Sequence, residues 1–164
     1  MKYVLVGKIV NTHGLKGEVR ILSDFKYKDR IFKEGMKIYI GKDKVCEEVT
    51  SYRHHKIFEM ITIKGYNDID QVLKYKGEYV FINKEDLVLN EYEYLDEDII
   101  GQKVIIDNKD IGLVRRIDKH GVNEVLVVRG VNKDYLIPYN FDIILNVDLE
   151  KREIMVKNIP GLID

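Results

Sequence analysis

The sequence predicts an all-β protein of two small β-barrels, joined by a short linker, with one short helix in the N-terminal barrel. Three observations predict this fold class. Short runs rich in Val, Ile and Tyr recur along the 164 residues, Gly, Asn and Asp separate them as turn signals, and a single segment has a clear helical pattern. Many short strands with close turns are typical of sandwiches and small barrels.

Ten runs have the composition of strands, five in each half of the chain. The segment NEVLVVRG, residues 123–130, is apolar on both faces and is therefore expected to be buried on both sides. The ten runs are residues 2–10, 17–22, 36–41, 58–65, 78–82, 103–107, 111–117, 124–130, 134–138 and 153–157.

The predicted helix covers residues 67–77, NDIDQVLKYKG. Asn67 is the expected N-terminal cap, with Asp70 three residues later at the spacing of a capping box. Gly77 can end the helix in the left-handed conformation. We expect this helix to close one end of the first barrel. Its apolar stripe consists of Ile69, Val72 and Leu73.

The chain divides into a predicted N-terminal domain of residues 1–89, an acidic linker of residues 90–97 and a C-terminal domain of residues 98–164. Residues 1–89 carry 17 Lys and Arg against 13 Asp and Glu, whereas residues 90–164 carry 10 against 15. This asymmetry suggests that the halves meet different surfaces, a phosphate backbone for the first and a basic protein for the second. Chance variation between two soluble domains explains it equally well.

The composition favours a cytoplasmic protein. No run of about 18 apolar residues exists, so no transmembrane helix is expected. The first ten residues are too interrupted by lysine to be a signal peptide. The single cysteine, Cys46, cannot form an internal disulfide, which agrees with a reducing compartment.

The motifs of common catalytic and cofactor sites are not found. Neither serine, Ser23 or Ser51, lies in a G-x-S-x-G context, and no P-loop or GxGxxG sequence occurs. Residues 107–112 lack the ligands of a Ca²⁺ loop and are expected to form a turn. His54 and His55 are adjacent and would point to opposite faces of a strand, where they cannot easily share a metal ion. We therefore expect no cofactor, no metal and no catalytic residue.

The segment NTHGLKG, residues 11–17, is interpreted as a hairpin loop. Gly14 and Gly17 permit backbone torsions that other residues avoid. Such a loop can contact phosphate through backbone N–H groups and lysine, but a tight turn explains the glycines equally well. The polar side chains that the hairpin would expose are Thr12, His13 and Lys16, with Arg20 on the returning strand.

The loop and its flanks, residues 6–21 (VGKIVNTHGLKGEVRI), resemble the N-terminal signature of the bacterial ribosome maturation factor RimM family, the 16S rRNA processing proteins. The resemblance continues in order over nearly the whole chain, and its C-terminal part is similar to the PRC barrel of that family. The further matching segments are residues 52–82, 98–105, 111–117, 123–130 and 135–164.

The resemblance implies a non-enzymatic, chaperone-like assembly factor. It implies binding to the free small (30S) ribosomal subunit late in maturation and assistance in forming the head, including docking of a head ribosomal protein, small-subunit protein nineteen. Processing of 16S rRNA would then depend on the factor indirectly. It implies no cofactor and no membrane contact, and we expect a monomer. A general PRC-barrel adaptor for protein interactions, or a nucleotide- or flavin-binding barrel enzyme, is the alternative interpretation.

Two sets of residues are predicted to contact the ribosome. Residues 53–56 (RHHK) are expected at a strand end near the first loop, where a merely solvated strand end is the alternative. Exposed Tyr and Arg are favoured at interfaces, although Tyr139 suits a core position equally well. The RNA-facing set is His13, Lys16, Arg20, Arg53 and Lys56. The partner-binding set is Tyr92, Tyr94, Asp98, Arg115, Arg116, Tyr135 and Tyr139.

One segment departs from the family pattern. Just before the second barrel, the family often has two adjacent tyrosines and then another aromatic residue. Tyr94, Leu95 and Asp96 occupy these places here, so the matching positions keep only one ring. Tyr92, two residues earlier, is the candidate to compensate.

Overall fold

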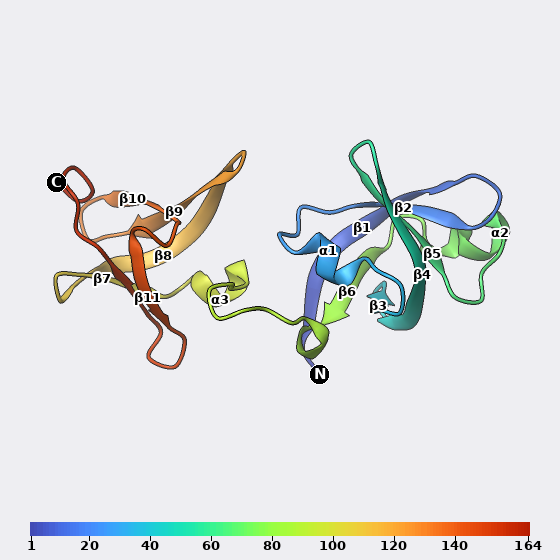
Figure 1. The fold of residues 1–164 in the computed structure, drawn as a ribbon, viewed down its shortest axis with the longest axis horizontal. Coiled ribbons are helices and arrows are strands. Elements are labelled where there is room, and N and C mark those ends of the chain that lie inside the picture. Colours follow the sequence, from blue (N-terminus) through green and yellow to red (C-terminus); the bar gives the residue numbers. More distant parts are fainter. The chain divides into compact units, whose positions relative to one another are not determined.

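The computed structural model describes residues 1–164, which form two compact units, Met1–Val88 and Leu89–Asp164 (Figure 1). Each unit is built on its own β-sheet, and its helices are no longer than about one turn. The predicted all-β fold class with two β units is therefore confirmed. None of the helices has the length and apolar character that a membrane crossing requires.

Unit 1 (Met1–Val88) is a closed barrel with the strand order β1-β2-β5-β4-β3-β6. All neighbouring strands are antiparallel, and the pairing of β1 with β6 closes the barrel. The strands are β1 (Tyr3–His13), β2 (Glu18–Leu22), β3 (Lys37–Ile40), β4 (Val45–His55), β5 (Phe58–Ile63) and β6 (Tyr79–Asn83).

The barrel core follows the alternation of the strands. Val19 and Ile21 on β2 and Val80 and Ile82 on β6 are fully buried, whereas the residues between them remain partly accessible or are exposed. Phe32, at the end of the short helix α1 (Lys28–Ile31), is also fully buried. Inward-facing apolar residues thus fill the barrel and leave the alternate positions for the surface.

None of the ten predicted runs covers β4, although residues 53–56 are expected at a strand end, and the reason lies in the burial pattern of the strand. Val49 is the one buried residue among its 11, so the strand lacks the apolar alternation that marks β-structure in a sequence. Its hydrogen-bonded ladders to β3 and β5 fix its place. A second strand without a predicted run, β11 (Ile144–Asp148) in the other unit, has Ile144 as its one buried residue.

The predicted helix is present as α2 (Ile69–Val72) followed by the 3₁₀ turn η1 (Leu73–Tyr75). The predicted cap is wrong by one residue. Asp68 caps the helix, because its Oδ1 accepts hydrogen bonds from the backbone N–H groups of Asp70 and Gln71 at 2.8 and 3.2 Å. The side chain of Gln71 completes the capping box by accepting from the Asp68 N–H at 3.2 Å. The partner at the third helical position is therefore an amide rather than the Asp70 carboxylate.

Unit 2 (Leu89–Asp164) is a six-stranded sheet with the order β10-β9-β8-β7-β12-β11, whose ladder does not close between β10 and β11. Its pairs are antiparallel except for the parallel pair of β12 with β7. The 3₁₀ turn η2 (Lys84–Asp86) lies at the end of unit 1. The elements of unit 2 are α3 (Asp96–Ile99), β7 (Lys103–Ile106), β8 (Lys109–His120), β9 (Asn123–Arg129), β10 (Asp134–Pro138), β11 and β12 (Glu153–Val156).

The core of unit 2 agrees with the apolar runs of the sequence. Leu126, Val127 and Val128 on β9 are fully buried, as the run at residues 123–130 predicts. The predicted turn at residues 107–112 is confined to Asp107 and Asn108, which join β7 to β8 with positive φ angles of 51° and 64°, because residues 109–112 belong to β8. Two successive residues with positive φ are typical of the tight type I′ hairpin turn.

Candidate functional site

The first hairpin loop, residues 14–17, joins β1 to β2 and confirms the hairpin prediction. Gly14 and Gly17 have φ angles of 69° and 89°, in the region that favours glycine. A Cβ atom on Gly17 would lie 3.2 Å from the carbonyl oxygen of Asp68, so the glycine also permits a close approach to the cap of α2. The Leu15 carbonyl accepts a hydrogen bond from the Ile69 N–H at 3.0 Å. The loop therefore rests against α2 and leaves its Lys16 side chain exposed.

His13, at the end of β1, is hydrogen-bonded to Arg20 on β2. The distance from Arg20 Nη2 to His13 Nδ1 is 2.6 Å. A guanidinium group only donates, so Nδ1 of His13 is the acceptor and a neutral His13 carries its proton on Nε2. The guanidinium carbon of Arg20 also lies 5.4 Å from the ring centroid of Phe58, and Arg20 Nε is buried without a hydrogen-bond partner. Arg20 is thus held by an imidazole and an aromatic ring.

His55, at the end of β4, joins this group. Its ring centroid lies 6.0 Å from that of His13. Desolvation lowers the pKa of His55, and the charges of Arg53, Lys56, His13 and Arg20 lower it further. An anion beside the two imidazoles would reverse this effect, because it favours the charged form of each ring.

Arg53 on β4 forms a bidentate ion pair with Glu18 on β2. Arg53 donates from Nε and Nη2 to the two carboxylate oxygens of Glu18, at 2.9 and 2.7 Å. These hydrogen bonds lower the pKa of the Glu18 carboxyl group. Arg53 therefore reaches the surface as a paired cation, a feature that the sequence does not reveal because Glu18 is 35 residues away.

The register of three strands gathers these side chains on one face. Arg20 lies opposite Met60 on β5, and Met60 lies opposite Arg53, so the three side chains share a row across β2, β5 and β4. The expectation that residues 53–56 lie at a strand end near the first loop is confirmed by the contact of His55 with His13. We call His13, Glu18, Arg20, Arg53 and His55 the imidazole–guanidinium cluster. Lys56, in the turn after β4, is exposed.

His54 points elsewhere, as the alternation of a strand predicts. Its Nδ1 lies 2.8 Å from Oε1 of Glu59, a carboxylate that is 1% exposed. The same oxygen accepts a hydrogen bond from the Tyr52 hydroxyl at 2.8 Å. Burial and this bond raise the pKa of Tyr52 to about 12. Tyr52 and His54 thus both contact the same oxygen of the buried Glu59 side chain. No group of three or more His, Cys, Asp or Glu in the structure is arranged to hold a metal ion.

In unit 2, three tyrosine rings surround Phe141. The Phe141 ring centroid lies 5.8 Å from that of Tyr92, 6.5 Å from that of Tyr94 and 6.4 Å from that of Tyr139. We call these four residues the Phe141 cluster. The sequence-based prediction contains the three tyrosines and misses Phe141, although its position two residues after Tyr139 is a signal that could have found it.

Tyr94 and Tyr139 are partly buried and pack against the apolar core of unit 2. The Tyr94 hydroxyl donates a hydrogen bond to the Glu91 carbonyl at 3.0 Å. Burial, reinforced by Glu91 and Tyr92, raises the pKa of Tyr94. Tyr92, by contrast, is 63% exposed. The cluster therefore has an anchored base, formed by Tyr94 and Tyr139, and two accessible rings, Tyr92 and Phe141.

The positions that depart from the family pattern have structural roles. Leu95 is buried, and Asp96 begins α3, where its Oδ2 lies 3.1 Å from Lys119 Nζ. Asp98, in the same helical turn, supplies a carbonyl oxygen that accepts from Gln102 Nε2 at 2.9 Å. Phe141, which is 45% exposed, brings a further ring to the surface beside Tyr92 and Tyr94.

The remaining predicted residues of unit 2 form a separate group on β8 and β10. Arg115 is the extra residue of a β-bulge, between Val114 and Arg116 in the ladder with β9. The bulge places Arg115 Nη1 3.4 Å from Asp134, whereas Arg116 Nε lies 2.8 Å from Asp118. Tyr135, on β10, is a further member of the predicted set. It packs against the core, and its ring centroid lies 5.2 Å from Lys133 Nζ.

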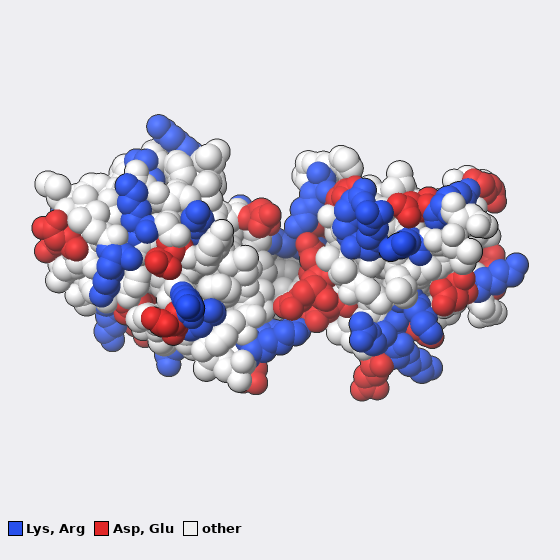
Figure 2. Space-filling view, turned by 180° about the vertical axis from the view of Figure 1, so that it is seen from behind, with Lys and Arg blue, Asp and Glu red and all other residues white.

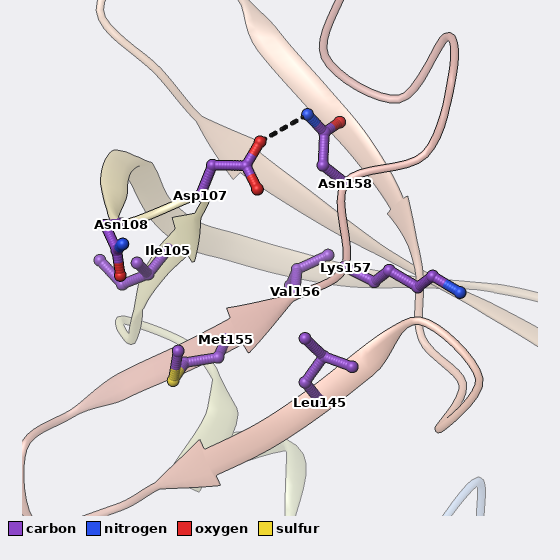
Figure 3. A pocket seen from close by; sticks show the side chains of 8 residues that line it. All are labelled: Ile105, Asp107, Asn108, Leu145, Met155, Val156, Lys157 and Asn158. Atoms are coloured by element: carbon purple, nitrogen blue, oxygen red, sulfur yellow. Dashed lines mark hydrogen bonds between the residues drawn. The ribbon is translucent and has the colours of Figure 1, made fainter.

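A shallow pocket of about 320 Å³ lies over β7, β11 and β12 of unit 2 (Figure 3). Leu145 and Met155 come from neighbouring strands and form part of its wall, and Asn158 Nδ2 donates to Asp107 Oδ2 at 2.8 Å on its rim. Its size lies at the lower end of the range of small-molecule sites. Its one carboxylate is engaged with an amide, so the pocket does not place a nucleophile beside a base.

Charged side chains of both signs are visible on one face of each unit. In the view of Figure 2, both signs of charge are present on each unit, and the group of Lys and Arg side chains on the right-hand unit is bordered by Asp and Glu. On this face, local geometry therefore distinguishes the candidate surfaces better than net charge does.

The comparisons with known proteins cover the whole chain. A family model for the RimM N-terminal domain matches residues 4–87, and one for the RimM PRC barrel domain matches residues 96–162. The ribosome maturation factor RimM of Staphylococcus haemolyticus is 42% identical over 166 residues, which cover 98% of this chain and 99% of that protein. The protein of the same name from an Exiguobacterium species is 37% identical over 169 residues, with coverage of 100% and 98%. A solved structure of a 16S ribosomal RNA processing protein RimM from Pseudomonas aeruginosa is 23% identical, covers 96% of this chain and 98% of its own, and has a TM-score of 0.44.

Proposed function

The chain belongs to the RimM family of ribosome maturation factors, and we propose that it is a cytoplasmic, non-enzymatic factor for late maturation of the small (30S) ribosomal subunit, on which 16S rRNA processing depends. The observation that carries this proposal is the full-length match, with both family domains present in order. We further propose residues 1–89 and 98–164 as its two binding domains, with residues 90–97 as the linker.

Unit 2 is proposed to bind a ribosomal protein of the subunit head, small-subunit protein nineteen. Residues 90–164 carry 15 acidic against 10 basic side chains, a balance that suits a basic partner. Tyrosine and arginine are common among the side chains that dominate binding energy at protein interfaces. Tyr92 supplies an accessible ring that packs on Phe141, and Phe141 in turn packs against Tyr94 and Tyr139. Asp98, Arg115, Arg116 and Tyr135 complete the proposed set.

Unit 1 is proposed to face 16S rRNA through His13, Lys16, Arg20, Arg53 and Lys56. Arg20 and Arg53 share one face of the barrel, and His13 and His55 lie next to each other at its border. Arginine and lysine side chains position a protein on phosphate groups without reading sequence. The imidazole–guanidinium cluster therefore suits an RNA backbone.

The proposed mechanism is mass action on a folding intermediate. A factor that binds a correct but unstable arrangement of the head raises its population by the free energy of binding, about 2.7 kcal/mol when the factor is present at 100 times its Kd. The factor must bind the mature particle less well, because equal affinity for both states would shift nothing.

Co-sedimentation tests this proposal. The purified chain is centrifuged with free small subunits and, separately, with whole ribosomes. We expect it to pellet with free small subunits and to remain in the supernatant with whole ribosomes. Equal binding to both particles, or binding to neither, would contradict an assembly role and would favour the general adaptor.

Tyr94→Ala makes the test more specific. We expect this variant to lose at least about fivefold in affinity for small subunits, because truncation of a tyrosine anchor costs more than about 1 kcal/mol. The ring also packs on the core, so a lower melting temperature is expected, but the variant should remain folded. Tyr94→Phe keeps the ring and loses only the bond to Glu91, so it should bind like the original chain. A cooperative melt that disappears in Tyr94→Ala would show that Tyr94 is structural.

A further inference from the structure

A second surface of unit 1 is formed by β1, β6 and β3, and none of its residues belongs to the predicted sites. In the register of these strands, Leu5 lies opposite Phe81, and Phe81 lies opposite Tyr39. The next row pairs Lys8 with Tyr79. The residues between them, such as Val80 and Ile82, are buried in the core. These rows therefore lie on the outer face of the barrel.

The aromatic rings of this face are accessible and well supported. Tyr79 is 50% exposed and Tyr3 is 38% exposed. Tyr3 packs edge-on against Tyr39, with 5.2 Å between the ring centroids, and Tyr39 is itself buried. Exposed rings that rest on a rigid strand lose little conformational freedom when a ligand stacks on them.

Two lysines lie directly over these rings. Lys8 Nζ is 5.3 Å from the centroid of Tyr79. Lys44 Nζ is 4.2 Å from the centroid of Phe81 and 5.7 Å from that of Tyr3. A cation at such a distance is attracted to the negative face of an aromatic ring. Positive charge and accessible rings are thus combined on one surface.

We propose that this face, comprising Tyr3, Lys8, Lys44, Tyr79 and Phe81, binds single-stranded RNA. Surfaces that hold single strands combine aromatic rings, on which bases stack, with cations that follow the phosphate backbone. Both elements are present here. Two acidic residues border the face: the side chain of Glu78 lies beside Gly41, and the charge of Asp86 helps to raise the pKa of Tyr39. Both carboxylates repel phosphate, so the RNA strand must lie over the lysines.

The spacing of the rings favours a single strand over a duplex. Tyr79 and Phe81 are two residues apart on β6, which places them about 6.7 Å apart along the strand. Stacked bases in a duplex repeat about every 3.4 Å, and their faces are covered by neighbouring bases. Only an unstacked strand can therefore offer one base to each ring.

The test is binding of fluorescently labelled decauridylate to the full chain, followed by anisotropy. We expect saturable binding that the double substitution Tyr3→Leu and Tyr79→Leu weakens at least about tenfold, since each base–ring stack contributes a factor of about 5 to 150. Leucine keeps the apolar area but removes the ring. Tyr79→Phe should bind like the original chain. Tyr92→Leu is the matched control, because Tyr92 is an exposed ring of unit 2.

Salt dependence tests the lysines. Substituting Lys8 and Lys44 by Gln should lower the slope of log affinity against log salt by about 1.4, because each phosphate group that a lysine neutralises contributes about 0.7. An RNA duplex of the same length should compete poorly. The proposal is overturned if the original chain does not bind decauridylate, if the duplex competes equally, or if binding is abolished only on substitution of Lys16 and Arg20. It is also overturned if the chain self-associates through this face, so that Tyr79→Leu dissociates a dimer and leaves RNA binding unchanged.

Thermal melts accompany every variant, and a variant that does not unfold cooperatively is replaced by the corresponding single substitution. The inference does not depend on the proposed role in subunit maturation, because free oligonucleotide is measured in the absence of ribosomal particles. Failure of oligonucleotide binding would leave the co-sedimentation result and the Tyr94 variants unaffected, so the two proposals can fail separately.

Discussion

In unit 1, polar contacts hold the imidazole–guanidinium cluster, whereas ring packing on an apolar core holds the Phe141 cluster of unit 2. Arg20 and Arg53 are positioned by an imidazole and a carboxylate, at 2.6 to 2.9 Å. Tyr94 and Phe141 are positioned by ring packing, with 6.5 Å between their centroids. The first arrangement responds to salt and pH, and the second to the loss of apolar area. The two surfaces therefore suit different partners and can be separated experimentally.

The strongest effect should come from Phe141→Ala, which removes the centre of the Phe141 cluster. We expect about a 30-fold loss of affinity for small subunits, equivalent to about 2 kcal/mol for a residue that anchors an interface. The salt dependence of binding should not change, because no charge is removed. Co-sedimentation at two salt concentrations measures both quantities.

The matched control for this variant is Leu149→Ala, since Leu149 and Phe141 are both 45% exposed. Leu149 lies outside the cluster, so its truncation should leave affinity unchanged. Equal losses in the two variants would show that the cluster has no special part in binding.

A smaller loss, about tenfold at low salt, is expected when Lys16 and Arg20 are both replaced by Gln. The slope of log affinity against log salt should fall by about 1.4 to 1.8, the contribution of two phosphate contacts. Lys33→Gln with Lys37→Gln, at exposed positions of the same unit, is the control. An unchanged slope would rule out Lys16 and Arg20 as phosphate contacts.

Glu18→Gln should strengthen binding to small subunits by a factor of about two to five, because it removes a negative charge from the phosphate-facing surface and releases Arg53 from its ion pair. Sedimentation over a range of concentrations can detect this gain. Weaker binding would indicate that the ion pair positions Arg53 for its partner, or that this surface does not face RNA at all.

Weaker effects still are expected in the pH dependence of stability. The pKa of His55 is lowered by folding, so the folded state resists its protonation and stability falls as pH drops through about 6.5, the ordinary value. The lowered pKa of Glu18 gives stability that is present above about 4.5 and lost as pH falls towards its folded value.

Melting temperatures between pH 7.5 and 3 separate the two groups. His55→Gln should flatten the upper part of the curve and Glu18→Gln the lower part, each by a few degrees at most, since exposed groups contribute little. A substitution in the Phe141 cluster should leave the shape of the curve unchanged. If His55→Gln steepens the upper part, the direction of its pKa shift is wrong.

Much of the fold can be predicted because it depends on local pattern. The apolar run at residues 123–130, the helix before Gly77 and the glycines of the first loop each carry a signal within a few residues. β4 and β11 carry no such signal, because each has one buried residue and owes its place to ladders with other strands. The helix cap is Asp68 rather than Asn67, because the Asp68 carboxylate accepts from the backbone N–H groups of Asp70 and Gln71.

The candidate sites show the same division. The proximity of His13 to residues 53–56 can be predicted in outline, since both lie at strand ends. The bond from His13 to Arg20, the pairing of Arg53 with Glu18 and the position of Phe141 among three tyrosines cannot. Each depends on the register between strands and on side-chain directions, which a linear pattern of residue types does not contain.

Strand composition and turn chemistry are local properties, so the amino-acid sequence is sufficient to establish two β units, the family and the residue types near each loop. The pairing of charges, the ring that completes the Phe141 cluster and the exposed face that Tyr3, Tyr79 and Phe81 share with two lysines follow from the folded chain. They do so because folding brings together residues that lie far apart in the sequence, up to 80 residues for Tyr3 and Asn83, which pair where β1 and β6 close the barrel of unit 1.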